Sequence, residues 1–94
     1  MKAIKLSKKY KFDDKEHNEI NVDFDKLTGA DIIAAETETM MLTQSPTSGV
    51  LELSKAYQAV IVAKASGLAV DCIMSLSAKD FSKVTLEASN FLLD

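Results

Sequence analysis

Apolar and polar residues alternate in two stretches near the start of the chain. In residues 4–12 the apolar side chains fall mainly on even positions, and residues 20–24 repeat this pattern. A period of two is typical of a β-strand with one buried face. The uniformly polar residues 13–19 between the two stretches therefore predict the turn of an antiparallel β-hairpin.

The alternation also predicts how the two strands pair. If Phe12 lies opposite Ile20, then Lys9 lies opposite Asp23, which gives the hairpin an apolar inner face and a charge-paired outer face. A hairpin of two strands is only marginally stable in water, so we expect its apolar face to pack on helices.

The rest of the chain has the period of 3.6 that predicts amphipathic helices. Helices are expected at residues 29–42, 50–66 and 78–92, with one or two helical turns at residues 69–75. The first is expected to bury four apolar side chains, those of Ile32, Ile33, Ala35 and Met40. In the second, residues 59–63 are apolar nearly all round, which indicates either a central position or a surface covered by a partner.

These elements predict one α+β domain over residues 1–94. An N-terminal antiparallel β-hairpin (residues 1–26) is expected to pack on a bundle of three main helices plus a short connecting helix (residues 27–94). Turn-forming residues 43–49, which include the only proline, are expected to connect the first two helices flexibly. A chain of this length buries roughly 60 to 65% of its extended surface, so the domain should fold without disulfides or metals.

The expected helices carry sequence signals at their ends. Thr28 and Asp31 predict a capping box at the first helix, in which the hydroxyl and the carboxylate each bind a free backbone N–H. Gly67 predicts the end of the second helix, since glycine readily adopts the positive φ of a C-cap. Ser77 and Asp80 predict a second capping box at the last helix.

Gly67 and Leu68 are followed by a short helical segment and then by Leu76, Ser77, Asp80 and Phe81. This order resembles the tail assembly chaperones of contractile-tailed bacteriophages, in which a Gly-Leu turn and a short helix precede Leu-Ser-x-x-Asp-Phe and an apolar helix. The likeness extends over most of the chain, because the family also opens with a lysine-rich strand, an acidic turn, a second strand and a threonine-capped helix. The chain departs from the family at Lys26 and Leu27, where a proline usually stands.

The resemblance implies a cytoplasmic, non-enzymatic, protein-binding assembly factor. Chaperones of this family bind the tape measure protein, the long helical ruler of the tail, and keep it soluble during tail formation. They are often made with a longer, frameshifted form of themselves, and they are absent from the mature virion. A small structural or adaptor component retained in the phage tail is the alternative function, and a second copy of the chain is a further candidate partner.

Composition narrows the classes of function. All eleven basic residues are lysines and the net charge is −3. Because arginine forms the bidentate contacts to phosphate and guanine, its absence argues against nucleic-acid binding, and a regulatory DNA-binding domain is disfavoured. The single cysteine excludes an internal disulfide and suits a reducing compartment. No apolar run approaches the ~20 residues of a membrane span, so we expect a soluble cytoplasmic protein without membrane contact.

His17 and Cys72 carry the most reactive side chains. A metal-binding or general-base role is one interpretation of His17, but an exposed turn lacks the oriented partner and sheltered pocket that catalysis requires. Cys72 has apolar neighbours in sequence, which favours a small buried side chain. Since the sequence contains no phosphate-binding loop or nucleophile elbow, we expect neither catalysis nor a bound metal or cofactor.

Met40 and Met41, next to the flexible connection, indicate where a partner binds. The unbranched methionine side chain adapts to varied apolar surfaces, although packing in the core is the alternative for each residue. Together with surplus apolar residues of the second helix they predict a partner-binding groove that includes Met40, Met41, Leu51 and Val62.

Overall fold

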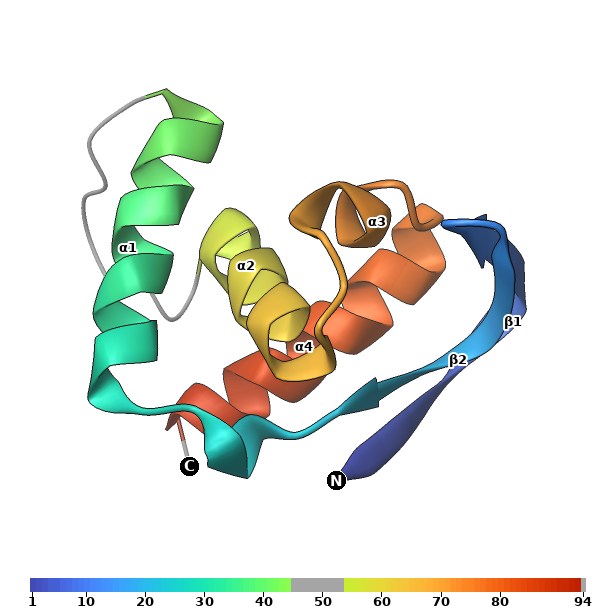
Figure 1. Cartoon of the computed structure of the whole chain (residues 1–94), viewed down its shortest axis with the longest axis horizontal. Coiled ribbons are helices and arrows are strands. Elements are labelled where there is room, and N and C mark those ends of the chain that lie inside the picture. The colour runs from blue at the N-terminus through green and yellow to red at the C-terminus, as the bar shows by residue number, and fades with distance from the viewer. Residues whose placement is uncertain (45–53, 94) are drawn as a thin grey trace.

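A β-hairpin followed by α-helices forms the described part of the chain (Figure 1). The computed structural model describes residues 1–44 and 54–93. The elements in chain order are β1 (Lys2–Phe12), β2 (Lys15–Val22), the 3₁₀ helix η1 (Phe24–Lys26), α1 (Gly29–Thr43), α2 (Lys55–Ser66), α3 (Val70–Met74) and α4 (Ala78–Leu93). The predicted α+β fold, with an antiparallel hairpin before three main helices and a short connecting helix, is confirmed.

Helix α2 lies at the centre of the fold and contacts α1, α3, α4, β2 and η1 (Figure 1). Every residue from Tyr57 to Ala63 is buried. A helix that is apolar nearly all round needs cover on all its sides, and the neighbouring elements supply it. Of the two alternatives for residues 59–63, the structure therefore shows the central position.

The start of α2 differs from the prediction. The helix begins at Lys55 rather than at residue 50, and Ser54 is its N-cap. The Ser54 Oγ atom accepts a hydrogen bond from the Tyr57 backbone N–H at 3.4 Å, which satisfies one of the donors that the first helical turn leaves free. Residues 50–53, which the prediction included in the helix, lie outside the described residues.

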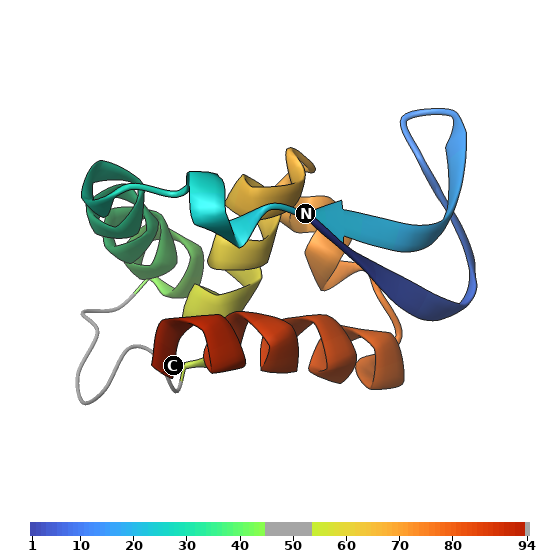
Figure 2. The ribbon, with the colours of Figure 1, turned by 90° about the horizontal axis from the view of Figure 1, so that it is seen from below.

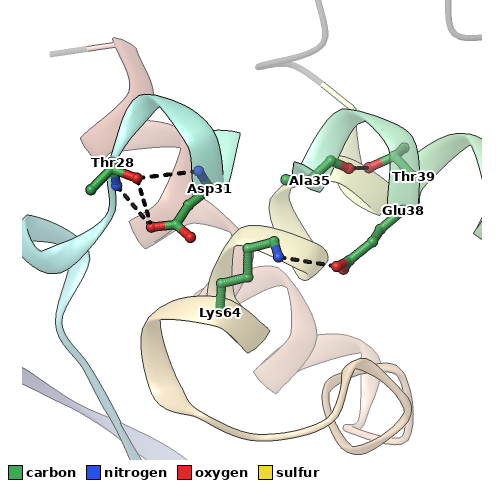
Figure 3. A network of polar contacts seen from close by, with 6 residues as sticks. All are labelled: Thr28, Asp31, Ala35, Glu38, Thr39 and Lys64. Atoms are coloured by element: carbon green, nitrogen blue, oxygen red, sulfur yellow. Dashed lines mark hydrogen bonds and ion pairs between the residues drawn. The ribbon is translucent and has the colours of Figure 1, made fainter. Parts of the chain in front are cut away.

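The predicted N-cap of α1 and the predicted C-cap of α2 are confirmed. The Thr28 Oγ1 atom accepts from the Asp31 backbone N–H at 3.4 Å, while the Thr28 backbone N–H donates to Asp31 Oδ2 at 2.9 Å (Figure 3). At the other cap, Gly67 has a φ of 78° and its N–H donates to the Ala63 carbonyl at 2.9 Å. These caps fix the direction in which the chain enters α1 and leaves α2.

The hairpin turn is shorter than predicted. Asp13 and Asp14 join the two strands, and both have positive φ, at 51° and 65°. Two consecutive left-handed residues form a tight turn that matches the twist of paired strands, and aspartate tolerates this conformation better than most residues. The prediction of a turn over residues 13–19 is therefore wrong, because residues 15–19 continue the strand.

The pairing of the strands changes with the turn. Phe12 pairs with Lys15, and Ile4 pairs with Ile20, so the predicted pairing of Phe12 with Ile20 is wrong. All three apolar side chains are nevertheless buried, as the alternating pattern predicts. The period of two fixed the inner face of the hairpin, whereas the turn geometry fixed its register.

The outer face of the hairpin carries ion pairs between the strands. Lys5 lies 3.7 Å from Glu19, and Lys9 lies 3.9 Å from Glu16. The predicted charge-paired outer face is thus present. Lys9 pairs with Glu16 and not with the predicted Asp23, because the strands pair in a different register. Exposed pairs of this kind contribute little to stability.

A long irregularity interrupts β1. The register shifts between Lys5 and Tyr10, so that residues 6–9 of β1 lie opposite Asn18. Residues in such a bulge leave the regular hydrogen-bond ladder and can bond to other elements. The Ser7 backbone N–H does so and donates to the Asp80 carboxylate of α4.

The start of α4 joins this irregular segment in a cluster that we call the β1–α4 junction, made of Ser7, Tyr10, Ser77 and Asp80. The Ser77 Oγ atom accepts from the Asp80 backbone N–H at 3.3 Å, which confirms the predicted N-cap. The Asp80 carboxylate accepts hydrogen bonds from the Ser7 N–H and the Ser7 hydroxyl, both at 2.9 Å, and from the Tyr10 hydroxyl at 2.5 Å.

The predicted capping box at α4 also required the Asp80 carboxylate to accept a hydrogen bond from the Ser77 backbone N–H, and this part of the prediction is wrong. The Asp80 carboxylate is directed toward β1, and the Ser77 backbone N–H donates instead to the Tyr10 hydroxyl at 3.1 Å. A buried carboxylate needs several donors, and the bulge of β1 offers more of them than the helix terminus does.

Replacing Ser77 by alanine should lower the free energy of unfolding by about 1 to 2 kcal/mol, because α4 loses its N-cap acceptor. Urea denaturation followed by circular dichroism measures the change. Ser82→Ala, an exposed position on the same helix, is the matched control and should change stability by less than about 0.5 kcal/mol. Equal effects of the two substitutions would mean that the Ser77 cap does not stabilise α4.

Figure 2 shows the hairpin extending beyond the helices, with its turn at the far end from η1. Aromatic contacts stabilise the outer part of this ribbon. The Phe12 ring lies 5.9 Å from the Tyr10 ring and 5.2 Å from the imidazole of His17, measured between centroids. His17 thus lies half-buried in β2, and the prediction of an exposed turn residue is wrong because the turn ends before it.

Candidate functional site

Helix α1 has apolar residues on two opposite sides. Ala35 and Thr39 are buried toward α2, and Ile32 packs beside them. On the other side, Ile33 is 64% exposed and Met41 is 74% exposed. At 100° per residue, these two sets lie on opposite sides of the helix axis. Helix α2 packs on the side of Ala35 and Thr39 and so does not cover Ile33 and Met41.

We define the outer face of α1 by the exposed residues that share this side of the helix, which are Ala30, Ile33, Ala34, Thr37, Met40 and Met41. The larger side chains among them are Ile33, Met40 and Met41. The small side chains between them let another backbone approach the helix closely. Helix α1 lies at the edge of the fold, with α2 on its inner side (Figures 1 and 2).

One polar contact joins α1 to α2, and a second satisfies a buried hydroxyl within α1 (Figure 3). The Lys64 ammonium of α2 lies 3.0 Å from Glu38 Oε1, and the Thr39 hydroxyl donates to the Ala35 carbonyl at 2.7 Å. The second bond satisfies a hydroxyl that faces the core, where an unpaired polar group would be costly. The outer face is therefore presented by a helix that is fixed at its capped start and along its inner side.

The charge of α1 is entirely negative, since residues 29–43 include Asp31, Glu36 and Glu38 and neither lysine nor arginine. The Thr28 backbone N–H donates to the Asp31 carboxylate and holds its pKa below the ordinary value. Burial opposes this shift, while the Thr28 hydroxyl and the charges of Lys64 and Lys26 reinforce it. The outer face therefore has an apolar centre with acidic neighbours.

The structure separates the four residues of the predicted groove. Met40 and Met41 lie on the outer face, at 39% and 74% exposure. Val62 is fully buried in α2, so the prediction that it contributes to a binding surface is wrong. It is enclosed because the central helix is covered on every side. Leu51 lies outside the described residues.

Ile33 is the residue of this surface that the sequence pattern misassigned. It was expected in the core and is exposed, so that assignment is wrong. Met40 had been assigned both to the core and to the partner-binding groove, and its exposure contradicts the core assignment. The sequence contained a signal that Ile33 and Ala35 face different ways. Ile33 and Met40 are seven residues apart, so they share one side of the helix, and Ala35 lies on the opposite side. A helix with two apolar sides does not show by itself which side meets the core.

A shallow depression of about 310 Å³ adjoins the inner margin of α1, between Glu38 and the segment from Ala63 to Val70. Its charged residues, Glu38 and Lys64, are paired with each other. The ion pair that connects α1 with α2 therefore forms part of its lining.

The remaining candidate chemistry lies apart from the outer face of α1. Cys72 is half-buried in α3, not fully buried as expected, because this short helix covers α2 with one side only. Within residues 1–44 and 54–93, no three histidine, cysteine, aspartate or glutamate side chains are grouped as a metal would require. In the same residues, no helix has the length and apolar character needed to cross a membrane.

The candidate site is thus an exposed helix face with an apolar centre and acidic margins. Exposed apolar patches of this kind are typical of surfaces that bind other proteins. No protein-family model, no curated protein and no solved structure matches this chain.

Proposed function

We propose that this protein is a non-enzymatic, protein-binding assembly factor, specifically a tail assembly chaperone of a contractile-tailed bacteriophage. Its partner would be the tape measure protein, which it keeps soluble in the host cytoplasm while the tail forms. The observation that carries the proposal is the outer face of α1, where Ile33 and Met41 are largely exposed on a helix that is otherwise well anchored.

The order of elements supports this assignment to a family. The resemblance implies a lysine-rich first strand, a second strand, a threonine-capped helix, and a short helix before a serine-capped one. The described residues contain these elements in that order, with Thr28 and Ser77 as the caps. The Gly-Leu turn at Gly67 and Leu68 also stands between α2 and α3.

The mechanism follows from the chemistry of the outer face. Long helical proteins expose apolar stripes that aggregate when they are left uncovered. Methionine side chains such as Met40 and Met41 are flexible and polarizable, so they can pack against successive segments of different sequence. A chaperone that covers such stripes reversibly keeps the ruler protein available for polymerisation and then leaves.

Co-expression with the tape measure protein tests the proposal. Ile33→Gln and Met41→Gln should each weaken binding about tenfold and reduce the soluble ruler protein, because each removes apolar contact from the interface. Met74→Gln is the matched control, since Met74 is a half-exposed methionine on α3. Equal amounts of soluble ruler with all variants, each shown to be folded, would contradict the proposal.

Two further measurements distinguish the proposed chaperone from related roles. Mass spectrometry of purified particles should not detect the chain, whereas a structural or adaptor component would remain in the virion. The resemblance also implies a longer frameshifted form as a second partner, so the coding sequence should contain a slippery site followed by an overlapping reading frame. A chain retained in particles would favour the alternative function.

A further inference from the structure

We infer that the outer face of α1 binds an amphipathic helix whose apolar stripe is flanked by lysine or arginine. This inference rests on the proposed function and names the chemistry of the segment that is bound. It follows from the arrangement of charge around the apolar centre, which is a separate observation from the exposure of the apolar residues.

Acidic side chains lie on both margins of the outer face. Thr37 is near its midline, and Glu36 and Glu38, the neighbours of Thr37 in sequence, lie about 100° to either side. Among the described residues, no ion pair includes Glu36. The side chain of Glu38 stays 50% exposed despite its contact with Lys64. A helix laid along Thr37 would therefore place its own flanking residues next to carboxylates.

The end of α1 reinforces this preference for positive charge. The last turn of the helix contains no basic residue, and its C-cap is Gln44. The carbonyl groups that end a helix carry partial negative charge, which favours a cation nearby. Met40 and Met41 lie in these final turns, so a basic residue beside the apolar stripe of the partner would meet this negative end.

The same charges disfavour a second copy of α1 as the occupant. In a two-fold symmetric pair the same surface meets itself, so Glu36 and Glu38 of one protomer would lie against the glutamates of the other. Like charges at an interface suppress that pairing. The acidic margins thus select a partner of opposite charge.

The shape of the face favours a helix as the bound element. From Ile33 to Met41 the apolar residues extend about 12 Å along the axis, at 1.5 Å per residue, which is roughly two helical turns. By their positions on the helix, the small side chains of Ala30, Ala34 and Thr37 lie beside the row of larger ones at Ile33 and Met40, the pattern that gives a helix surface its ridges and grooves. Ridges of one helix pack into such grooves of another.

Synthetic peptides provide the probe. Each has about 18 residues, long enough to populate a helix, and carries the same leucine stripe at positions i, i+3, i+4 and i+7. One peptide has lysine flanks, the second has glutamate flanks, and the third has lysine flanks with glutamine in the stripe. Each is titrated into the isotope-labelled full chain and followed by NMR chemical shifts.

The lysine-flanked leucine peptide should bind about tenfold or more tightly than the glutamate-flanked one at low ionic strength, and added salt should narrow this gap. Its chemical-shift changes should fall on residues 29–43. The glutamine-stripe peptide should bind much more weakly. Glu36→Lys should reduce or reverse the preference for lysine, whereas Asp25→Lys, at an exposed acidic position on η1, should leave it unchanged.

Equal affinity for the lysine-flanked and glutamate-flanked peptides would overturn the inference. Chemical-shift changes confined to elements other than α1 would also overturn it. The same holds if residues 45–53 or a second copy of the chain prove to cover the outer face already. If Ile33→Gln reduces the soluble ruler protein but the charge of the peptide has no effect, the inference fails and the proposed function stands. If the lysine-flanked peptide binds α1 while Ile33→Gln leaves the ruler soluble, the proposed function fails instead.

Discussion

Replacing Asp80 by alanine is expected to lower the free energy of unfolding by about 3 to 5 kcal/mol, the larger part of the stability of many small domains. The substitution removes the acceptor of three hydrogen bonds that join the bulge of β1 to α4. The Ser7 N–H and the Ser7 hydroxyl would then lack their partner in a partly buried site, and the Tyr10 hydroxyl would keep only the Ser77 Oγ atom, 3.1 Å away. Urea denaturation of the purified variant measures the loss.

Tyr10→Phe is the graded control for this prediction. It removes one of the three donors to Asp80 and the acceptor of the Ser77 N–H, and it leaves the two donors from Ser7, so it should cost about 1 to 2 kcal/mol. A loss below about 1 kcal/mol for Asp80→Ala would show that the β1–α4 junction does not hold the hairpin in place.

The pH dependence of the same site has a defined sign. Burial tends to raise the pKa of Asp80, but the hydrogen bonds from Tyr10, Ser7 and Ser77 together lower it below its ordinary value of 3.8. A carboxyl with a lowered pKa contributes its full stabilisation above the ordinary value and loses it as the pH falls through the pKa of the folded state. The folded chain should therefore lose stability in acid below about pH 4, and Asp80→Asn, which cannot titrate, should lose less.

The second large effect is expected at the centre of α2. Val62→Gln should lower the free energy of unfolding by about 4 kcal/mol and prevent folding if the domain has little stability to lose, because it buries an amide at a fully enclosed apolar position. Met41→Gln makes a comparable polar change on the outer face of α1 and should alter stability by less than about 0.5 kcal/mol.

Thermal and urea unfolding of these two variants, measured side by side, give the comparison. A Val62→Gln variant as stable as the unmodified chain would mean that α2 is not the covered central helix. A strongly destabilised Met41→Gln variant would mean that Met41 belongs to the core, and the outer face of α1 would then be smaller than the structure shows.

Local signals in the sequence predicted much of the fold correctly. Thr28, Gly67 and Ser77 each cap the helix at which they were expected, because a cap depends on a few neighbouring residues and on their own backbone. The alternation in the first strands identified the buried side chains of the hairpin for the same reason. The nearly continuous apolar stretch at residues 59–63 identified the helix that lies at the centre or against a partner.

Other features depended on what each element packs against. The residues of the hairpin could not reveal a two-residue turn at Asp13 and Asp14, since a longer polar loop satisfies the same pattern. Asp80 has the spacing of a capping box, yet its carboxylate binds the bulge of β1, which lies about seventy residues away in sequence. No local rule contains that contact.

The sequence by itself determined that this chain forms a hairpin and helices, that Thr28, Gly67 and Ser77 cap three of those helices, and that α1 carries apolar residues on more than one side. Only the tertiary structure decided which of them are exposed. Because α2 takes Ala35 and Thr39 as its contact with α1, Ile33 and Met41 are left outside, while Val62 is enclosed on every side. The cause is physical, since burial belongs to the packing of several elements together and a pattern along one helix gives only the choice of faces.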